Sequence, residues 1–135
     1  MYDRNAAERQ HRQSVIQGKS ALSFKEAICI AEKQVEAHTF GTASRDQVRT
    51  LCRVMAEVYM MPSDREVRID GEMLSVAMVK DVYKEINASH VQEVLISLSA
   101  VQTEIKNIKA YLRTALYNSV FELDVKYYYE GALPL

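Results

Sequence analysis

Apolar residues recur along most of this chain with the spacing of an α-helix. The clearest stretch runs from Asn107 to Asn118, where they fall at i, i+3, i+4, i+7 and i+8 and so share one face. Asn107 is a residue type that caps helix starts, and Asn118 can end a helix in the left-handed conformation. Lys106, Lys109 and Arg113 lie off the apolar stripe, as does Asn118. We expect a core helix with a positively charged outer face and an apolar stripe of Ile108, Tyr111, Leu112, Ala115 and Leu116.

Two earlier segments repeat this spacing behind a capping residue. Ser23 stands three residues before Glu26, which is the pattern of a capping box, and its helix is expected to end near His38. Ser44 and Gln47 have the same spacing, and the second helix is expected to reach about residue 60. The residues expected to face inward are Phe24, Ala27, Ile28, Ala31 and Val35 in the first helix and Val48, Leu51, Cys52, Met55 and Tyr59 in the second.

Between residues 66 and 74 the helical spacing gives way to alternation. Val67 and Ile69 are apolar and are flanked by polar residues, which is the pattern of a half-buried strand. Asp70 and Gly71 follow directly and favour a tight turn. An isolated two-stranded hairpin is only marginally stable, so this element is expected to lean on the neighbouring helices.

Two more amphipathic helices follow this turn. Ser75 is placed to cap the first, which should end near residue 86, and Ser89 with Gln92 offers a capping box for the second. The expected inward residues are Val76, Val79, Tyr83 and Ile86, and then Val91, Val94, Leu95 and Leu98. The short connections favour antiparallel neighbours. The predicted fold class is therefore mainly α: a compact bundle of about five to six helices with a short β-hairpin or extended arm near residues 66–74.

The two ends of the chain differ from its middle. Residues 1–22 are polar and irregular, with a local excess of positive charge from Arg4, Arg9, Arg12 and Lys19. We interpret this segment as a linker or tail, with a basic arm for nucleic acid as the alternative. Residues 23–135 are expected to form a single helical domain. Residues 127–129 are three consecutive tyrosines, which cannot all face inward, and at least one is expected to pack with an exposed hydroxyl or to stack on bases.

The composition is that of an ordinary globular domain. The chain has 135 residues, of which 48% are hydrophobic and 26% are charged. Its formal charge of −1 removes the simplest case for a duplex-DNA binder, which would show a basic excess. Cys29 and Cys52 lie among apolar residues without a Cys/His cluster, so we expect buried free thiols in a reducing cytoplasm. No apolar run approaches the length of about 20 residues that a membrane helix needs, so we expect a cytoplasmic protein without membrane contact.

No motif for nucleophilic, metal or phosphate chemistry is apparent in the sequence. There is no GxSxG, HExxH, Walker loop or GxGxxG. His11, His38 and His90 are far apart in the sequence. His38 is expected to interact with carbonyl groups at a helix end, and His90 to be partly exposed and structural. We therefore expect that the protein is not an enzyme and that it binds no cofactor and no metal ion.

Two short strings carry a resemblance to a known family. They are N-I-K-A-Y-L followed by A-L-Y-N in residues 107–118, and V-R-I-D-G in residues 67–71. From about Asp46 to Glu130 the chain resembles the C-terminal domain of the replication initiator RepA proteins of Gram-positive plasmids and integrative elements. In that family a similar string precedes a tyrosine-bearing tail. The resemblance implies a helical fold similar to the C-terminal domain of the primosome protein DnaD.

The resemblance also implies a role in replication initiation. In such proteins an N-terminal winged-helix domain binds origin DNA, and the C-terminal domain engages host replication proteins. No winged-helix segment precedes Ser23 in this sequence, so we expect an excised domain or a stand-alone relative. The first hypothesis is a non-catalytic domain that recruits the host primase or helicase loader to an origin.

Two alternatives stay open at this point. One is a domain that binds single-stranded nucleic acid through cations and the tyrosine tail, and the other is a structural or self-association module. The residues predicted to contact a partner or nucleic acid are Lys106, Lys109, Arg113, Asn118, Tyr127 and Tyr128.

Overall fold

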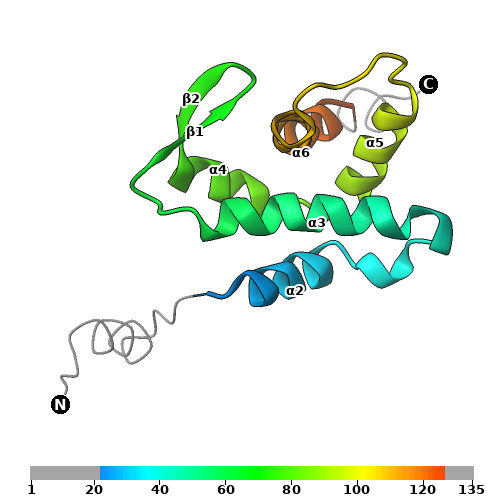
Figure 1. Ribbon diagram of the computed structural model, residues 1–135, viewed down its shortest axis with the longest axis horizontal. Coiled ribbons are helices and arrows are strands. Elements are labelled where there is room, and N and C mark those ends of the chain that lie inside the picture. Colours follow the sequence, from blue (N-terminus) through cyan, green and yellow to red (C-terminus); the bar gives the residue numbers. More distant parts are fainter. Residues whose placement is uncertain (1–21, 127–135) are drawn as a thin grey trace.

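The computed structural model describes residues 22–126, which form five α-helices and one β-hairpin (Figure 1). The mainly α bundle with a short hairpin that the sequence predicts is confirmed. The elements in chain order are α2 (Phe24–Gln34), the 3₁₀ turns η1 (Ala37–Thr39) and η2 (Thr42–Ser44), α3 (Arg45–Met60), β1 (Glu66–Ile69), β2 (Glu72–Ser75), α4 (Val76–Tyr83), α5 (Ala88–Ser99) and α6 (Ile108–Lys126). Tyr127 and Tyr128 lie outside the described residues.

Helix α3 lies at the centre of the molecule. It packs against α2 on one side and against α4, α5 and α6 on the other (Figure 1). Four of its five predicted inward residues are buried and Tyr59 is half-buried. Val54, Ala56 and Val58 are buried as well, because a helix covered on two sides buries a wider arc than one stripe.

A polar network around Tyr83 links four helices within this core. Tyr83, the last residue of α4, is fully buried, and its hydroxyl donates to the Arg113 carbonyl oxygen on α6 at 2.8 Å. Its own carbonyl accepts from Gln34 Nε2 of α2 at 2.7 Å. The Tyr59 hydroxyl of α3 donates to Gln34 Oε1 at 2.7 Å and lies 3.2 Å from the Tyr83 carbonyl oxygen. Gln34 also donates to the Ile86 carbonyl at 2.8 Å, so both N–H groups and the oxygen of its side-chain amide form hydrogen bonds.

The hairpin rests on α6. Its strands pair in the register Val67↔Leu74 and Ile69↔Glu72, and the side chains of Val67 and Ile69 are buried. Asp70 and Gly71 have φ of 54° and 82°, as a two-residue hairpin turn requires. The Asp70 N–H donates to Thr114 Oγ1 of α6 at 3.0 Å. The turn is thus attached to the bundle, as the predicted dependence on the helices requires.

Three helix ends differ from the prediction. α4 ends at Tyr83 rather than near residue 86. α2 ends at Gln34 rather than near His38, because Glu36 adopts the left-handed conformation with φ of 53° and the chain turns into η1. α6 does not end at Asn118 but continues to Lys126. The inward face of α6 also continues past Asn118, since the next two residues, Ser119 and Val120, are both buried.

The predicted caps are right where the chain enters a helix from an extended residue. Ser23 and Glu26 form the expected capping box, with Ser23 Oγ accepting from the Glu26 N–H at 3.0 Å. Ser75 and Asn107 also cap as expected, by accepting from Met78 and Ala110. The Ser44–Gln47 box was a wrong prediction, because Ser44 ends a 3₁₀ turn and its side chain makes no capping bond.

The predicted Ser89–Gln92 box is also wrong, because Asn87 caps α5. Its Oδ1 accepts from the Ser89 N–H at 2.8 Å, and its own N–H donates to His90 Nδ1 at 2.9 Å. His90 is only 5% exposed, so the expectation of a partly exposed histidine is wrong. It is placed in the third position of α5, where it completes the capping box from the buried side.

A few burial predictions fail at single positions. Cys52 is buried, and burial raises the pKa of its thiol to about 12, but Cys29 is exposed because it lies off the Ala27–Ala31 stripe. Phe24 and Ile108 are 38% and 46% exposed, since each is the first residue of its helix and lies at the edge of the core. No helix within residues 22–126 combines the length and the apolar character needed to cross a membrane.

The Tyr83 network predicts a measurable loss of stability in Tyr83→Phe. Removing the hydroxyl eliminates its bond to the Arg113 carbonyl, and a hydrogen bond of this kind contributes about 1 kcal/mol. Urea denaturation should show a lower free energy of unfolding by about that amount. Tyr117→Phe is the control, because within residues 22–126 the Tyr117 hydroxyl has no hydrogen-bond partner. Equal stability of Tyr83→Phe and the wild type would contradict the role of this bond.

The His90 cap predicts that the domain loses stability on acidification. Nδ1 accepts from Asn87 only when the ring is neutral, and burial lowers the pKa of His90, with Asp124 and Glu85 acting in the opposite direction. The unfolded chain therefore takes up the proton first as the pH falls. The stabilisation is complete above about pH 6.5 and is lost as the pH falls through the lowered pKa of the folded state.

The test compares thermal melts of wild type and His90→Gln between about pH 7.5 and pH 5.5. Glutamine can accept from the same N–H in a capping box but does not titrate. The melting temperature of wild type should fall more steeply with acidification than that of His90→Gln. Parallel curves for the two proteins would show that His90 does not carry this pH dependence.

Candidate partner-binding surfaces

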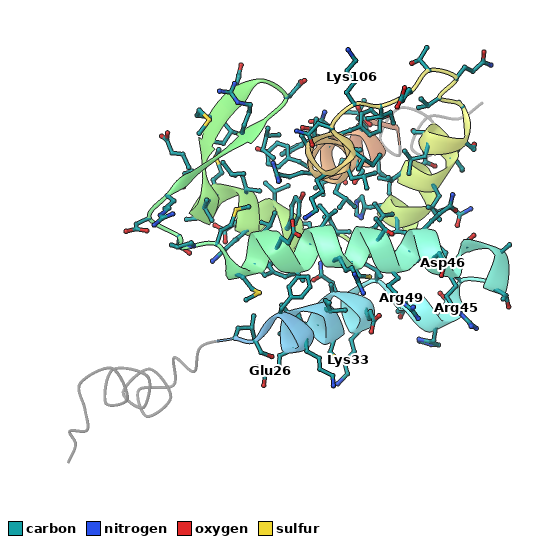
Figure 2. The ribbon with its side chains drawn as sticks, in the orientation of Figure 1. Glu26, Lys33, Arg45, Asp46, Arg49 and Lys106 are labelled. Carbon is teal, nitrogen blue, oxygen red and sulfur yellow. The ribbon has the colours of Figure 1, made fainter. Side chains whose placement is uncertain are left out.

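The cations predicted to form one contact surface differ in exposure and in their partners. Lys106 lies in the loop before α6, is exposed, and points away from the bundle (Figure 2). Lys109 Nζ forms an ion pair with Glu57 Oε2 of α3 at 2.8 Å. Part of its charge is therefore already neutralised within the fold. Since the pair is largely exposed, its contribution to stability is small.

Arg113 is half-buried beside the Tyr83 network. Its carbonyl accepts the Tyr83 hydroxyl bond, and its positive charge partly counteracts the rise in the pKa of Tyr83 that burial causes. Asn118 stands five residues further on, which is about 140° around the helix axis from Arg113. It is nine residues, or about 180°, from Lys109. The predicted site residues of α6 therefore lie on different sides of one helix.

The predicted positive outer face of α6 is also interrupted by other residues. Beyond Asn118 the exposed positions of the helix are Phe121, Glu122, Asp124 and Val125. Phe121 and Val125 are 48% and 54% exposed. The Phe121 ring packs against Tyr117, with ring centroids 5.4 Å apart. From Ser119 to Val125 the exposed side chains of the helix are therefore apolar or acidic.

Asn118 instead lines a groove between α5 and α6. The groove has a volume of about 280 Å³ and combines apolar side chains with polar groups. Helix α5 contributes Glu93, Val94 and Ser97. Helix α6 contributes Tyr111, Thr114, Ala115, Asn118, Ser119, Glu122 and Leu123. We call these residues the α5–α6 groove.

The geometry of the groove follows from residue size and helix spacing. Ser97, Ala115 and Ser119 are small and leave space between the two helices. Ser119 is buried and its hydroxyl donates to the Leu116 carbonyl at 2.7 Å, so its polarity is satisfied within the helix. The Asn118 amide remains at the surface of the groove, between an apolar wall and carboxylates.

The groove contains two carboxylates. Glu93 contributes one from α5 and Glu122 one from α6, and the part of the lining that the structure describes includes no Lys or Arg side chain. Tyr111 and Leu123 supply apolar surface. Such a site suits an apolar side chain flanked by basic ones, as on one face of an amphipathic helix.

Residues 107–118, which contain the string that resembles the RepA family, thus have two structural roles. Leu112 and Leu116 are buried in the core, whereas Tyr111, Ala115 and Asn118 line the α5–α6 groove. Sequence reasoning identified Asn118 but missed the contribution of α5, notably Glu93 and Ser97. The sequence did contain a signal that a second element packs on this helix. Apolar residues occur all around the C-terminal half of α6, and a helix with this pattern is covered on more than one side.

Sequence reasoning also missed a group of cations on α2 and α3. Arg45, Arg49 and Arg53 recur every four residues on α3 and are all exposed. Lys33 of α2 lies near the first two of them. The spacing of four was a visible signal of one helix face. Within residues 22–126 no group of three or more His, Cys, Asp or Glu side chains is arranged to hold a metal ion.

Comparison with known proteins places the chain in one family. A family model matches residues 5–131, nearly the whole chain, and is described as a family of unknown function. No curated protein and no solved structure matches the chain.

Proposed function

The chain belongs to this family, DUF6017, and we propose that it is a non-catalytic binding domain that recruits host replication proteins to a replication origin. The partner would be the primase or the helicase loader. The resemblance of residues 46–130 to the C-terminal domain of RepA-type initiators supports this proposal. The proposal is carried by one observation: the string behind that resemblance contributes to a surface groove as well as to the core.

Some residues of this string lie in the core and others lie at the surface, as a binding role requires. Residues needed only for folding would all face inward, as Leu112 and Leu116 do. Tyr111, Ala115 and Asn118 instead lie along the α5–α6 groove. An amide in such a groove can bond to a partner's backbone, and the tyrosine ring offers apolar area at low conformational cost.

The chemistry of the groove favours a protein partner over nucleic acid. Its lining includes the exposed carboxylate of Glu122, which repels phosphate. Lys109 is paired with Glu57 and Arg113 is half-buried, so α6 offers no continuous cationic track. A partner helix with an apolar side chain between basic residues would complement the groove in shape and charge.

Binding of purified host primase and helicase loader to the chain tests this proposal. The variant Ser97→Arg/Glu122→Lys fills the groove and reverses its charge, and should weaken binding at least about tenfold. Gln92→Arg/Glu104→Lys makes the same changes in residue class at exposed positions outside the groove, and should bind like the wild type. Both variants should keep the thermal melt of the wild type.

Two results would contradict the proposal. The first is a folded wild-type chain that binds neither the primase nor the loader. The second is binding that the groove variant and its control weaken equally, since this would remove the groove as the contact surface.

A further inference from the structure

A second surface lies at the corner where α2 leads through η1 and η2 into α3 (Figure 2). The side chains there surround a hollow of about 500 Å³. Its lining includes the cations Lys33 of α2 and Arg45 and Arg49 of α3, together with the His38 side chain of η1. We call this surface the α2–α3 corner.

Within the part of the chain that the structure describes, the charged groups of Lys33, Arg45 and Arg49 have no partner. Lys33, Arg45 and Arg49 are exposed, and no ion pair or hydrogen bond joins their side chains to other residues between 22 and 126. Lys109, by contrast, is held by Glu57 at 2.8 Å. The corner therefore presents guanidinium and ammonium groups that are free to bind an external anion.

The hollow between these cations has an apolar floor. Phe40 and Ala37 are half-buried in it, and Val48 below them is 2% exposed. An apolar side chain that enters the hollow would cover this floor. Carboxylates on either side of it would meet Arg45 and Arg49, whose guanidinium groups can bind carboxylates with two parallel hydrogen bonds.

We propose that the α2–α3 corner binds an acidic segment of a protein partner that carries a bulky apolar side chain. The proposal rests on the proposed function in that it takes the partner to be a protein. The acidic residues of the segment would pair with the cations of the corner. Its apolar side chain would cover the floor around Phe40.

A phosphate backbone fits this corner less well. Glu32 lines the hollow beside Lys33, and Asp46 lies between the two arginines in the sequence. A regular polyanion would have to pass these carboxylates, whereas a peptide can place its acidic residues around them. The formal charge of −1 also gives the chain no overall attraction for a polyanion.

The test is a fluorescence-anisotropy titration of the full 135-residue chain against three labelled probes. The first is a ten-residue peptide with four aspartates around a leucine–phenylalanine pair. The second has the same charge with both apolar residues changed to glycine. The third is a 20-nucleotide oligothymidine. We expect the first probe to bind, the second to bind at least about fivefold more weakly, and added salt to weaken both, since salt screens exposed charges.

Charge reversal identifies the surface. Arg45→Glu/Arg49→Glu should weaken binding of the first peptide at least about tenfold. Lys84→Glu/Lys106→Glu makes the same change at two exposed cations outside the corner and should leave binding within about twofold of the wild type. If the reversed variant fails to fold by thermal melt, Arg45→Gln/Arg49→Gln removes the charges without reversing them and should also weaken binding.

Four outcomes would overturn the proposal: no binding of the first peptide to the folded chain, equal binding of both peptides, equal effects of the corner and control variants, or oligothymidine binding at the corner without peptide binding. The peptide assay contains no replication protein. Peptide binding without binding of primase or loader would therefore contradict only the proposed function. The reverse result would contradict only this inference.

Discussion

The arrangement of the helices depends on the hydrogen bonds made by Tyr83. A residue at the end of a helix has a carbonyl without an intrahelical partner, and a buried orphan of this kind is costly. Here that carbonyl accepts from the Ile86 N–H just beyond the helix at 3.0 Å and from Gln34 of α2 at 2.7 Å, with Tyr59 of α3 close by, while the Tyr83 hydroxyl reaches α6. One residue therefore joins α2 and α6 to the end of α4. Because α6 is held at Arg113, its rotation about its own axis is set, and this rotation places Lys109 toward Glu57 and Asn118 toward α5.

The sequence predicted those parts of the fold that local chemistry determines. The stripes of α3 and α4, the turn at Asp70 and the cap at Ser23 all depend on residues close together in the chain, and all were correct. The failures occur where distant contacts decide. Asn118 is a suitable helix end on local grounds, but α6 continues because the buried face on α5 continues. His90 was expected to be partly exposed but is buried. Its burial comes from packing between distant segments, which the spacing of residues along the chain does not reveal.

The candidate surfaces show the same division between local and distant contacts. Spacing placed Lys109, Arg113 and Asn118 off the apolar stripe, but it could not tell which neighbour each would meet. Glu57 lies 52 residues from Lys109, and no local pattern joins them. Lys33 and the arginines of α3 come together only because α2 folds back along α3 (Figure 2). The structure places Leu112 and Leu116 of residues 107–118 in the core and Tyr111, Ala115 and Asn118 along the groove.

The hydroxyl of Thr114 connects the hairpin turn to the α5–α6 groove. It accepts the bond from Asp70 that attaches the hairpin turn, and Thr114 also lines the α5–α6 groove. A two-stranded hairpin has little stability of its own and takes its order from the surface beneath it. Any molecule that occupies the groove thus competes with, or reinforces, the attachment of the turn. Amide exchange in the hairpin would therefore report an occupant of the groove that contacts Thr114.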